Sequence, residues 1–164
     1  MEHDYFGIID ETFSGGLFWS DPVDVAEQSV EVSLTAEKAS SVRPVALDSA
    51  ASMIQGLEAF DSRARDALVA QLDERASVTT EYVNQSSEEL GESLLDILVD
   101  NSGDLAIDVL RSLQLVSVAF SVENAGEGEE FAVFAYSISP DDTDTLLLVS
   151  FDIRGDVVAV ETEE

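Results

Sequence analysis

Residues 29–34, SVEVSL, alternate strictly between polar and apolar side chains. In an extended chain the two valines and the leucine fall on one face, and the two serines and the glutamate fall on the other. This period of two is typical of a β-strand with one buried face and one face in water. The stretch therefore predicts a sheet that is covered on one side.

The chain before this strand, residues 4–21 (DYFGIIDETFSGGLFWSD), carries five aromatic side chains among eighteen residues. Gly15-Gly16 can supply the positive φ of a turn between two short strands, Tyr5–Ile9 and Leu17–Trp19. Aromatic side chains suit the half-buried surface of a pleated strand. We predict that this stretch is the first hairpin of an antiparallel, three-strand N-terminal meander, and that its aromatics lie in the core.

The period changes to that of a helix after residue 47. The apolar positions that follow the i, i+3, i+4, i+7 spacing of an amphipathic helix are Ala50, Met53, Ile54 and Leu57. Asp, Ser and capping-box spacing mark the expected helix starts. The predicted N-terminal caps are Asp48, Asp61, Ser86 and, for a short fourth helix, the stretch 100–104. Residues 77–84 fit a helix or a strand, so we predict a helical middle of three to four helices.

The C-terminal third returns to strands. The predicted strands are residues 116–122, 131–138, 146–153 and 157–160, with Arg154-Gly155-Asp156 as a hairpin turn. Their connections are too short for parallel crossovers, so we predict an antiparallel C-terminal meander. The order of strands, helices and strands predicts one α+β domain over residues 1–164, with the helices packed on one face of the sheet.

Negative charge dominates the composition. The 164 residues include 35 Asp and Glu against seven Lys and Arg, which gives a formal net charge of −28. Such a surface repels nucleic-acid phosphates and anionic lipids, so we expect neither a nucleic acid nor a membrane partner. The acids are scattered through every segment, which favours a solubility adaptation over a phosphate-mimicking surface for a basic partner.

Several compartments and chemistries are not indicated by the sequence. No apolar run approaches the roughly 18 residues of a membrane span, and the first residues lack the basic and apolar segments of a secretory signal. The chain has no cysteine, so a disulfide, a thiolate zinc site and a cysteine nucleophile are excluded. We therefore expect a cytoplasmic protein.

No motif indicates a catalytic residue or a cofactor. His3 is the sole histidine, and we expect it in a solvated terminus rather than in a Ser-His-Asp triad. Neither Gly15-Gly16 nor the acidic stretch 126–129 has the lysine or helix start of a phosphate loop. Our prediction is therefore no catalytic residue and no cofactor.

Acidic side chains flank the aromatic hairpin and permit two interpretations. Asp10, Glu11 and Asp21 lie beside the aromatics, so a cleft with the paired carboxylates of a glycosidase could form there. A hairpin core with a wet rim explains the same residues, and we favour it. Should the hairpin contact a partner instead, the candidate residues are Tyr5, Phe6, Phe18, Trp19 and Asp21.

Two acidic stretches, DNSGD at 100–104 and DDTD at 141–144, offer clustered oxygen ligands of the kind that Ca²⁺ prefers. Both lack the ligand order of an EF-hand. Helix capping and turn chemistry account for them, so we predict no metal site.

The chain resembles a known bacterial family. The residues that carry the resemblance are DYFGIID, the isolated Trp19, the alternating strand before the helical middle, and the strands VSVAFSVE, FAVFAYSIS and TLLLVSFDIRGDVVAVETEE. They are similar to the family of uncharacterised proteins called domain of unknown function two thousand and four, over nearly the whole chain. The resemblance implies a small cytoplasmic bacterial protein with no assigned activity, and it transfers no catalytic residue.

From the sequence we expect a non-enzymatic binding or regulatory module. One alternative is an acidic immunity or inhibitor-type protein that neutralises a basic partner such as a nuclease. A second is a carboxylate-dependent hydrolase at the aromatic hairpin. A protein partner of basic character and a homodimer both remain open.

Overall fold

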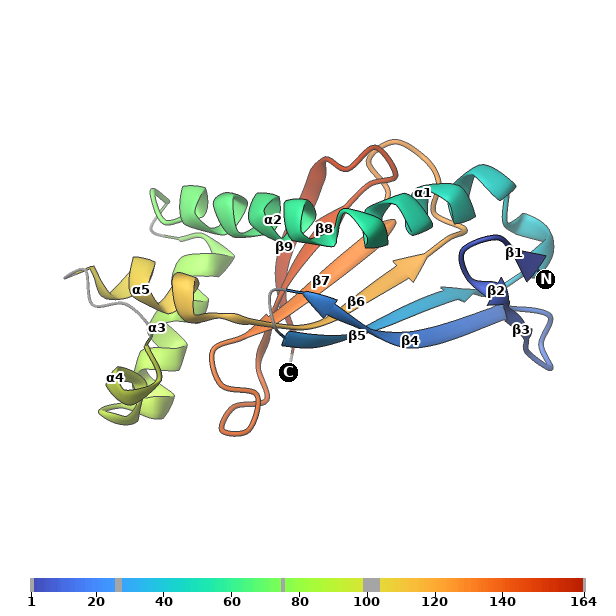
Figure 1. Cartoon of the computed structure of the whole chain (residues 1–164). Helices are drawn as coiled ribbons and strands as arrows, with labels where there is room; N and C mark the ends of the chain where they lie inside the picture. Colours follow the sequence, from blue (N-terminus) through green and yellow to red (C-terminus); the bar gives the residue numbers. More distant parts are fainter. Residues whose placement is uncertain (1, 26–27, 75, 99–103, 164) are drawn as a thin grey trace.

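The computed structural model describes residues 2–25, 28–74, 76–98 and 104–163 (Figure 1). Its main feature is a seven-stranded sheet in which the strands lie in chain order. These strands are β3 (Asp10–Glu11), β4 (Leu17–Val25), β5 (Gln28–Ala36), β6 (Gln114–Ser121), β7 (Ala132–Ser137), β8 (Leu146–Phe151) and β9 (Val157–Glu163). A separate two-stranded ribbon pairs β1 (Glu2–His3) with β2 (Gly7–Ile8).

Five α-helices and one short 3₁₀ turn lie between β5 and β6 in the described residues. They are η1 (Ala39–Ser41), α1 (Pro44–Gln55), α2 (Leu57–Gln71), α3 (Val78–Leu90), α4 (Ser93–Ile97) and α5 (Leu105–Ser112). Figure 1 shows α1 and α2 running one after the other across one face of the sheet, with α3, α4 and α5 gathered at one end. The predicted α+β class is therefore confirmed. No helix in the described ranges is long and apolar enough to cross a membrane.

The two predicted meanders form one sheet, but the predicted first strand, Tyr5–Ile9, is wrong: Gly7–Ile8 pairs in the separate ribbon, and β3 takes its place in the sheet. Antiparallel pairs join β3, β4 and β5 at one end and β6, β7, β8 and β9 at the other. Between them β5 and β6 are parallel, with Val32 opposite Val118 and Leu34 opposite Phe120. A parallel pair needs a long crossover, and the whole helical segment supplies it.

Alternation in the strands places the core on the helix side. Val30, Val32 and Leu34 are fully buried, as the period of two predicts, and Val118 and Phe120 of β6 continue this layer. The alternate positions of the same strands face away from the helices; on this side Glu31 and Ala119 are exposed, and Ser33 and Ser117 are half-buried.

The first two predicted caps are wrong. The first helix begins at Pro44, and Asp48 lies one turn inside it. A proline is well suited to the first helical position, because its φ is already helical and no N–H is needed there. Likewise α2 begins directly after Gly56, so Asp61 lies in its second turn.

Residues 77–84 belong to a helix. Ser77 caps α3, because its hydroxyl accepts a hydrogen bond from the Thr80 N–H at 3.1 Å. The predicted cap Ser86 therefore lies inside α3. This helix ends at Leu90, and Gly91 follows it before the short α4. Asp104, the last residue of the predicted capping stretch 100–104, caps α5, since its carboxylate accepts a hydrogen bond from the Ile107 N–H. Residues 100–103, expected to end the preceding helix, lie outside the described residues.

Candidate functional site

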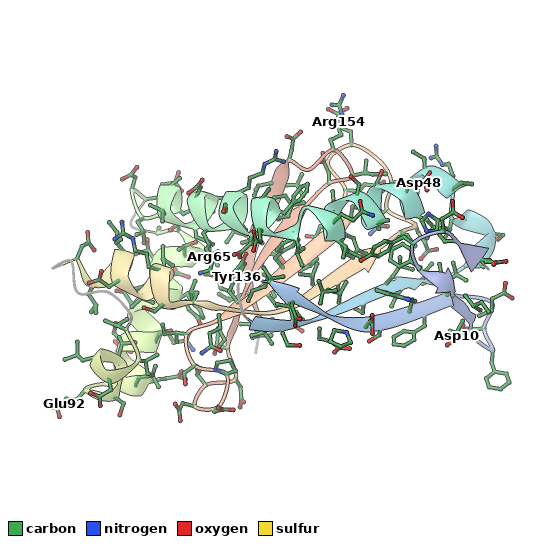
Figure 2. All side chains as sticks on the ribbon, in the orientation of Figure 1. Asp10, Asp48, Arg65, Glu92, Tyr136 and Arg154 are labelled. Atoms are coloured by element: carbon green, nitrogen blue, oxygen red, sulfur yellow. The ribbon has the colours of Figure 1, made fainter. Side chains whose placement is uncertain are left out.

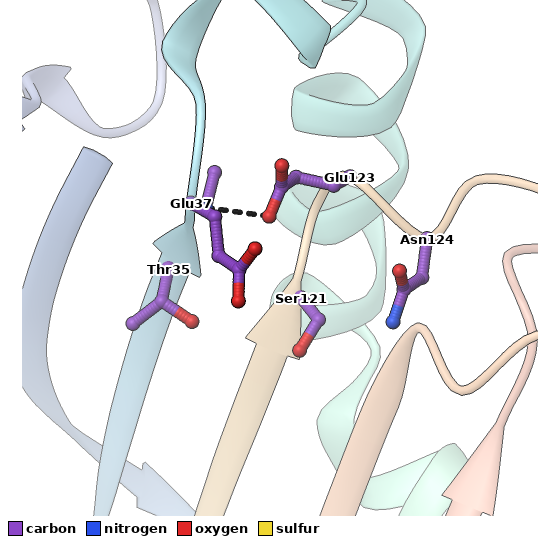
Figure 3. Close-up of a pocket in the computed structure, with 6 residues that line it drawn as sticks. Thr35, Glu37, Ser121, Glu123 and Asn124 are labelled. Carbon is purple, nitrogen blue, oxygen red and sulfur yellow. Dashed lines mark hydrogen bonds between the residues drawn. The ribbon is translucent and has the colours of Figure 1, made fainter. Parts of the chain in front are cut away.

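A polar cleft of about 470 Å³ lies where the parallel strands β5 and β6 end. Its lining residues are Thr35, Ala36, Glu37, Ser121, Glu123 and Asn124 (Figure 3). Thr35 and Ser121 are register partners on the side of the sheet away from the helices. In open sheets with parallel strands, ligands bind outside the carboxyl ends of those strands. This position makes the cleft the first candidate site.

Two glutamates in the cleft have different surroundings. The Glu123 carboxylate accepts hydrogen bonds from the backbone N–H groups of Glu37 and Lys38, the second at 3.2 Å. In Figure 3 the Glu37 carboxylate lies between Thr35 and Ser121. Within the described residues the Glu37 side chain makes no hydrogen bond or ion pair. The cleft can therefore accept a cationic or hydrogen-bond-donating group, and it would repel a phosphate.

The structure does not bring the five predicted contact residues onto one surface. Phe18 and Trp19 are neighbours in β4, so they face opposite sides of the sheet. Trp19 is half-buried on the helix side, where its ring meets the buried Phe6 ring edge to face at 4.7 Å. Asp21 is exposed and follows Trp19 on the helix side, opposite Val32.

The prediction that the hairpin aromatics lie in the core is therefore only partly right. The rings of Phe6 and Trp19 do pack on the core. Tyr5 and Phe18 are 40% and 47% exposed, and Phe13 is fully exposed. Position explains the difference: Phe18 faces the side of the sheet away from the helices, Tyr5 lies in the turn between β1 and β2, and Phe13 lies in the turn between β3 and β4.

Phe13 was missed as a candidate, although it lies at the tip of this hairpin. The turn is closed by the Thr12 N–H, which donates to the Gly16 carbonyl at 2.9 Å, and Gly15 has a φ of +87°. The turn also docks on the start of η1, where the Ala39 N–H donates to the Gly15 carbonyl at 2.8 Å. The sequence signal that identifies Phe13 as a candidate is an aromatic residue among the Thr, Ser and Gly residues of a turn.

Gly16 explains why the hairpin tip lies beside the cleft. A Cβ at this position would lie 2.3 Å from the Ala36 carbonyl oxygen and 3.0 Å from that of Glu37. Only glycine allows such a close approach of two backbones. The exposed aromatics and the cleft therefore form one continuous end of the molecule.

His3 is a structural contact between the N-terminal ribbon and α1, and the expectation of a solvated terminus is wrong. Its Nε2 lies 2.8 Å from Asp48 Oδ1, and its Nδ1 accepts the Tyr5 N–H at 3.1 Å. The imidazole ring also packs on Phe6, with 5.2 Å between ring centroids. His3 therefore packs on Phe6, which in turn packs on Trp19.

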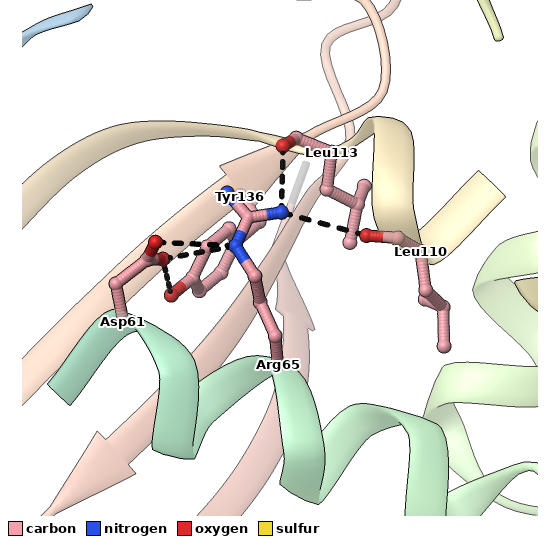
Figure 4. A network of polar contacts seen from close by, with 5 residues as sticks. All are labelled: Asp61, Arg65, Leu110, Leu113 and Tyr136. Carbon is pink, nitrogen blue, oxygen red and sulfur yellow. Dashed lines mark hydrogen bonds and ion pairs between the residues drawn. The ribbon is translucent and has the colours of Figure 1, made fainter. Parts of the chain in front are cut away.

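A second polar cluster lies between α2 and the sheet (Figures 2 and 4). The Tyr136 hydroxyl donates to Asp61 at 2.7 Å, and Arg65 Nε donates to the same carboxylate at 3.1 and 3.2 Å. Arg65 Nη1 donates to the Leu113 carbonyl at 2.9 Å. Burial, followed by the Asp61 charge, raises the pKa of Tyr136 far above its ordinary value. Because every group has a partner, we assign this cluster to the fold.

Asp152 holds two turns together and is likewise structural. Its side chain is buried and accepts the backbone N–H groups of Gly128, Arg154 and Asp156 at 3.0 to 3.1 Å. Burial alone would raise the pKa of Asp152, but these hydrogen bonds and the Arg154 charge together lower it below 3.8. The predicted turn at Arg154-Gly155-Asp156 is confirmed, and Gly155 adopts a φ of +86°.

The calcium alternative finds no support in the described ranges, which contain no group of three or more acidic or histidine side chains placed to hold a metal ion. In the loop at 141–144, the Asp142 carboxylate accepts a hydrogen bond from the Ser139 hydroxyl at 2.6 Å, as in a turn. Residues 100–103 of the other candidate stretch lie outside the described residues.

No family model, curated protein or solved structure matches the chain. The resemblance to the family of uncharacterised bacterial proteins therefore stays a prediction.

Proposed function

We infer that the protein is a non-enzymatic module that binds another protein through the end formed by its first hairpin and the adjoining cleft. The observation that carries this proposal is the placement of exposed aromatics. Among the described residues, the exposed aromatic side chains are Tyr5, Phe13 and Phe18, and all three belong to this end.

Phe13 gives the strongest support. A phenylalanine side chain contributes about 1.5–3 kcal/mol when it is buried, and the fully exposed Phe13 contributes none of this to the fold. Aromatic anchors of this kind dominate the energy of many protein interfaces. The docked Gly15-Gly16 turn holds the ring on a defined backbone, which lowers the entropy cost of binding.

The cleft favours recognition over hydrolysis. A glycosidase needs one carboxyl group in an apolar pocket, whereas this cleft is lined mainly by hydroxyl, amide and carboxylate groups. Glu123 uses both carboxylate oxygens on backbone N–H groups. We propose a location in the bacterial cytoplasm, as the family resemblance implies, and a protein rather than a nucleic acid as the partner.

Site-specific photo-crosslinking in the host cells tests this function. A photoreactive phenylalanine analogue replaces Phe13 or Phe18 in separate variants, and it replaces Leu95 as the control. Leu95 is 67% exposed on α4, at the other end of the molecule (Figure 1). We expect a discrete adduct of the same mass from positions 13 and 18, and none from position 95. No adduct at 13 and 18, or the same adducts at all three positions, would contradict the proposal.

A further inference from the structure

The side of the sheet that the helices leave open is uncharged across its centre. One row of register partners crosses six strands of this side and consists of Ser20, Ser33, Ala119, Val133, Ser150 and Ala159. The parallel row beside it continues through Ser117, Ala135 and Leu148. We call these nine residues the open face; Ser20 and Ala119 are exposed, Ala135 and Ser150 are buried, and the other five are half-buried. None of the nine is charged, although 35 of the 164 residues are acidic.

Acidic side chains border the open face. Glu31 and Glu161 are the members of the second row on β5 and β9, and both are exposed. Glu37 and Glu123 of the cleft lie at the end of β5 and β6. An uncharged centre inside a charged border is the usual anatomy of a protein interface.

The helices show the opposite distribution. Their exposed positions carry many acids, including Asp48, Glu58, Asp66, Glu81 and Glu88. A general solubility surface would distribute acids over both sides of the molecule. A solubility adaptation therefore does not explain why the centre of this side is uncharged.

The parallel pair of β5 and β6 gives an independent argument. Parallel strands occur mostly in sheets that are covered on both faces. Here α1 and α2 cover one side of the pair, and Ala119 at its other side is exposed (Figure 1). Among the described residues, no second layer covers Ala119 on this side of the pair.

We propose that the open face docks an α-helix of a basic partner protein, which presents small and apolar side chains to the centre and Lys or Arg to the acidic border. This inference rests on the proposed binding function and names the partner's chemistry. Phe18 supports the connection, because it faces the same side as Thr35 and Ser121 and so extends the surface to the hairpin.

Geometry specifies the helix further. Glu31 on β5 and Glu161 on β9 are separated by four inter-strand spacings, about 19 Å. A helix that crosses the strands covers this distance in about 13 residues. Its basic side chains should therefore be about 14 residues apart, the nearest spacing that returns to the same helix face, at the two ends of an apolar stripe.

A second copy of the chain fits this surface poorly. Stacking two open faces would bring the acidic borders of two molecules together, each with a net charge of −28. Like charges across an interface oppose association. The charge of the border thus favours a basic partner.

The test uses a synthetic helical peptide as the probe. The peptide has an Ala/Leu stripe with lysine pairs about 14 residues apart on the same helix face, and a control peptide of the same composition carries its lysines at the middle. Binding is measured by titration calorimetry, and the contact surface by amide chemical shifts of the full chain. Two protein variants, Ala119→Arg on the open face and Ala70→Arg on α2, add the same charge at exposed positions.

We expect chemical-shift changes centred on the open face, and a preference for the first peptide. Ala119→Arg should raise the Kd at least about tenfold, through steric block and like charge, while Ala70→Arg should change it less than about twofold. The double variant Glu31→Gln/Glu161→Gln, which cannot disturb the core, should also weaken binding and reduce its dependence on salt.

Several results would overturn the inference. These are shift changes on the helices instead of the open face, equal effects of the two arginine variants, equal affinity for both peptides, or no binding at millimolar peptide. A wild-type dimer that Ala119→Arg dissociates would identify a second copy as the occupant. If photo-crosslinking at position 13 gives an adduct but the peptide does not bind, the helix-docking inference is wrong and the proposed binding function stands. Peptide binding without those adducts would count against the hairpin as the contact site.

Discussion

Replacing Arg65 tests the assignment of the Asp61, Arg65 and Tyr136 cluster to the fold. Arg65→Met keeps most of the side-chain volume but removes the partner of Asp61, whose side chain is 16% exposed. It also removes the donor to the Leu113 carbonyl at the end of α5. Hydrogen bonds to charged groups contribute about 1.5–3 kcal/mol each.

Arg65 is itself 28% exposed, so water can replace part of what is lost. We therefore expect a total cost of about 3 kcal/mol, below the sum of the individual contacts. For a chain of this size, this lowers the melting temperature by about 6–12 °C. Thermal and urea unfolding followed by circular dichroism measure both quantities.

Two further variants make the interpretation specific. Arg63→Met on the same helix removes an exposed guanidinium that lies 5.0 Å from the Phe60 ring centroid, and it should cost less than about 1 kcal/mol. Arg65→Lys keeps the charge but not the planar fork, so it should recover only part of the loss. If Arg65→Met unfolds like Arg63→Met, the cluster does not stabilise the fold and its assignment is wrong.

Three more predictions follow from the described contacts. The pKa of Asp152 in the folded state lies below its ordinary value, so ionised Asp152 stabilises the fold above about pH 4, and this effect is lost as the pH falls through the lowered pKa. Asp152→Asn should therefore reduce the loss of unfolding free energy on acidification, as measured by urea unfolding at several pH values. If the free energy falls with pH as steeply in the variant as in the wild type, the structural role assigned to Asp152 is wrong. His3→Ala should shift the fluorescence emission of Trp19, the sole tryptophan, to longer wavelength, because it removes the ring that packs on Phe6. Asp48→Ala keeps the imidazole on Phe6 and should give a smaller shift. Equal shifts in the two variants would show that the contact between His3 and Phe6 is unimportant. The melting temperature should rise from roughly 10 mM to several hundred mM sodium chloride, because salt screens the repulsion among the acids; a flat or falling curve would show that the charges are balanced locally.

Local pattern was enough for the elements whose side chains alternate or repeat regularly. The alternation at 29–34 predicts which side of β5 is buried, and the capping stretch at 100–104 predicts that a helix follows it, as α5 does. The pairing of β5 with β6 has no local signal, because a long helical segment separates the two strands. The two meanders could therefore be predicted separately, but not their union into one sheet.

The cleft escaped sequence reasoning for a similar reason. The Glu37 N–H and the Glu123 carboxylate that accepts from it are 86 positions apart in the chain. Asp48 and Asp61 were assigned as caps because local spacing allowed it, whereas tertiary contacts with His3 and Tyr136 explain their positions better. Phe13 had a local signal, an aromatic residue in a turn of small and polar residues, but core and surface aromatics look alike in a sequence.

The acidity of the chain also takes a different meaning once the strands are paired. Along the sequence the acids are scattered, which favours a solubility surface, and the serines and alanines of the strands resemble ordinary wet positions. Pairing places those small residues side by side on one surface, while Glu31 and Glu161 fall at its two sides. A solubility surface has no need of such a gap, because one more carboxylate at Ala119 or Val133 would serve solubility equally well. The arrangement of the acids, rather than their number, is therefore the argument for a basic partner.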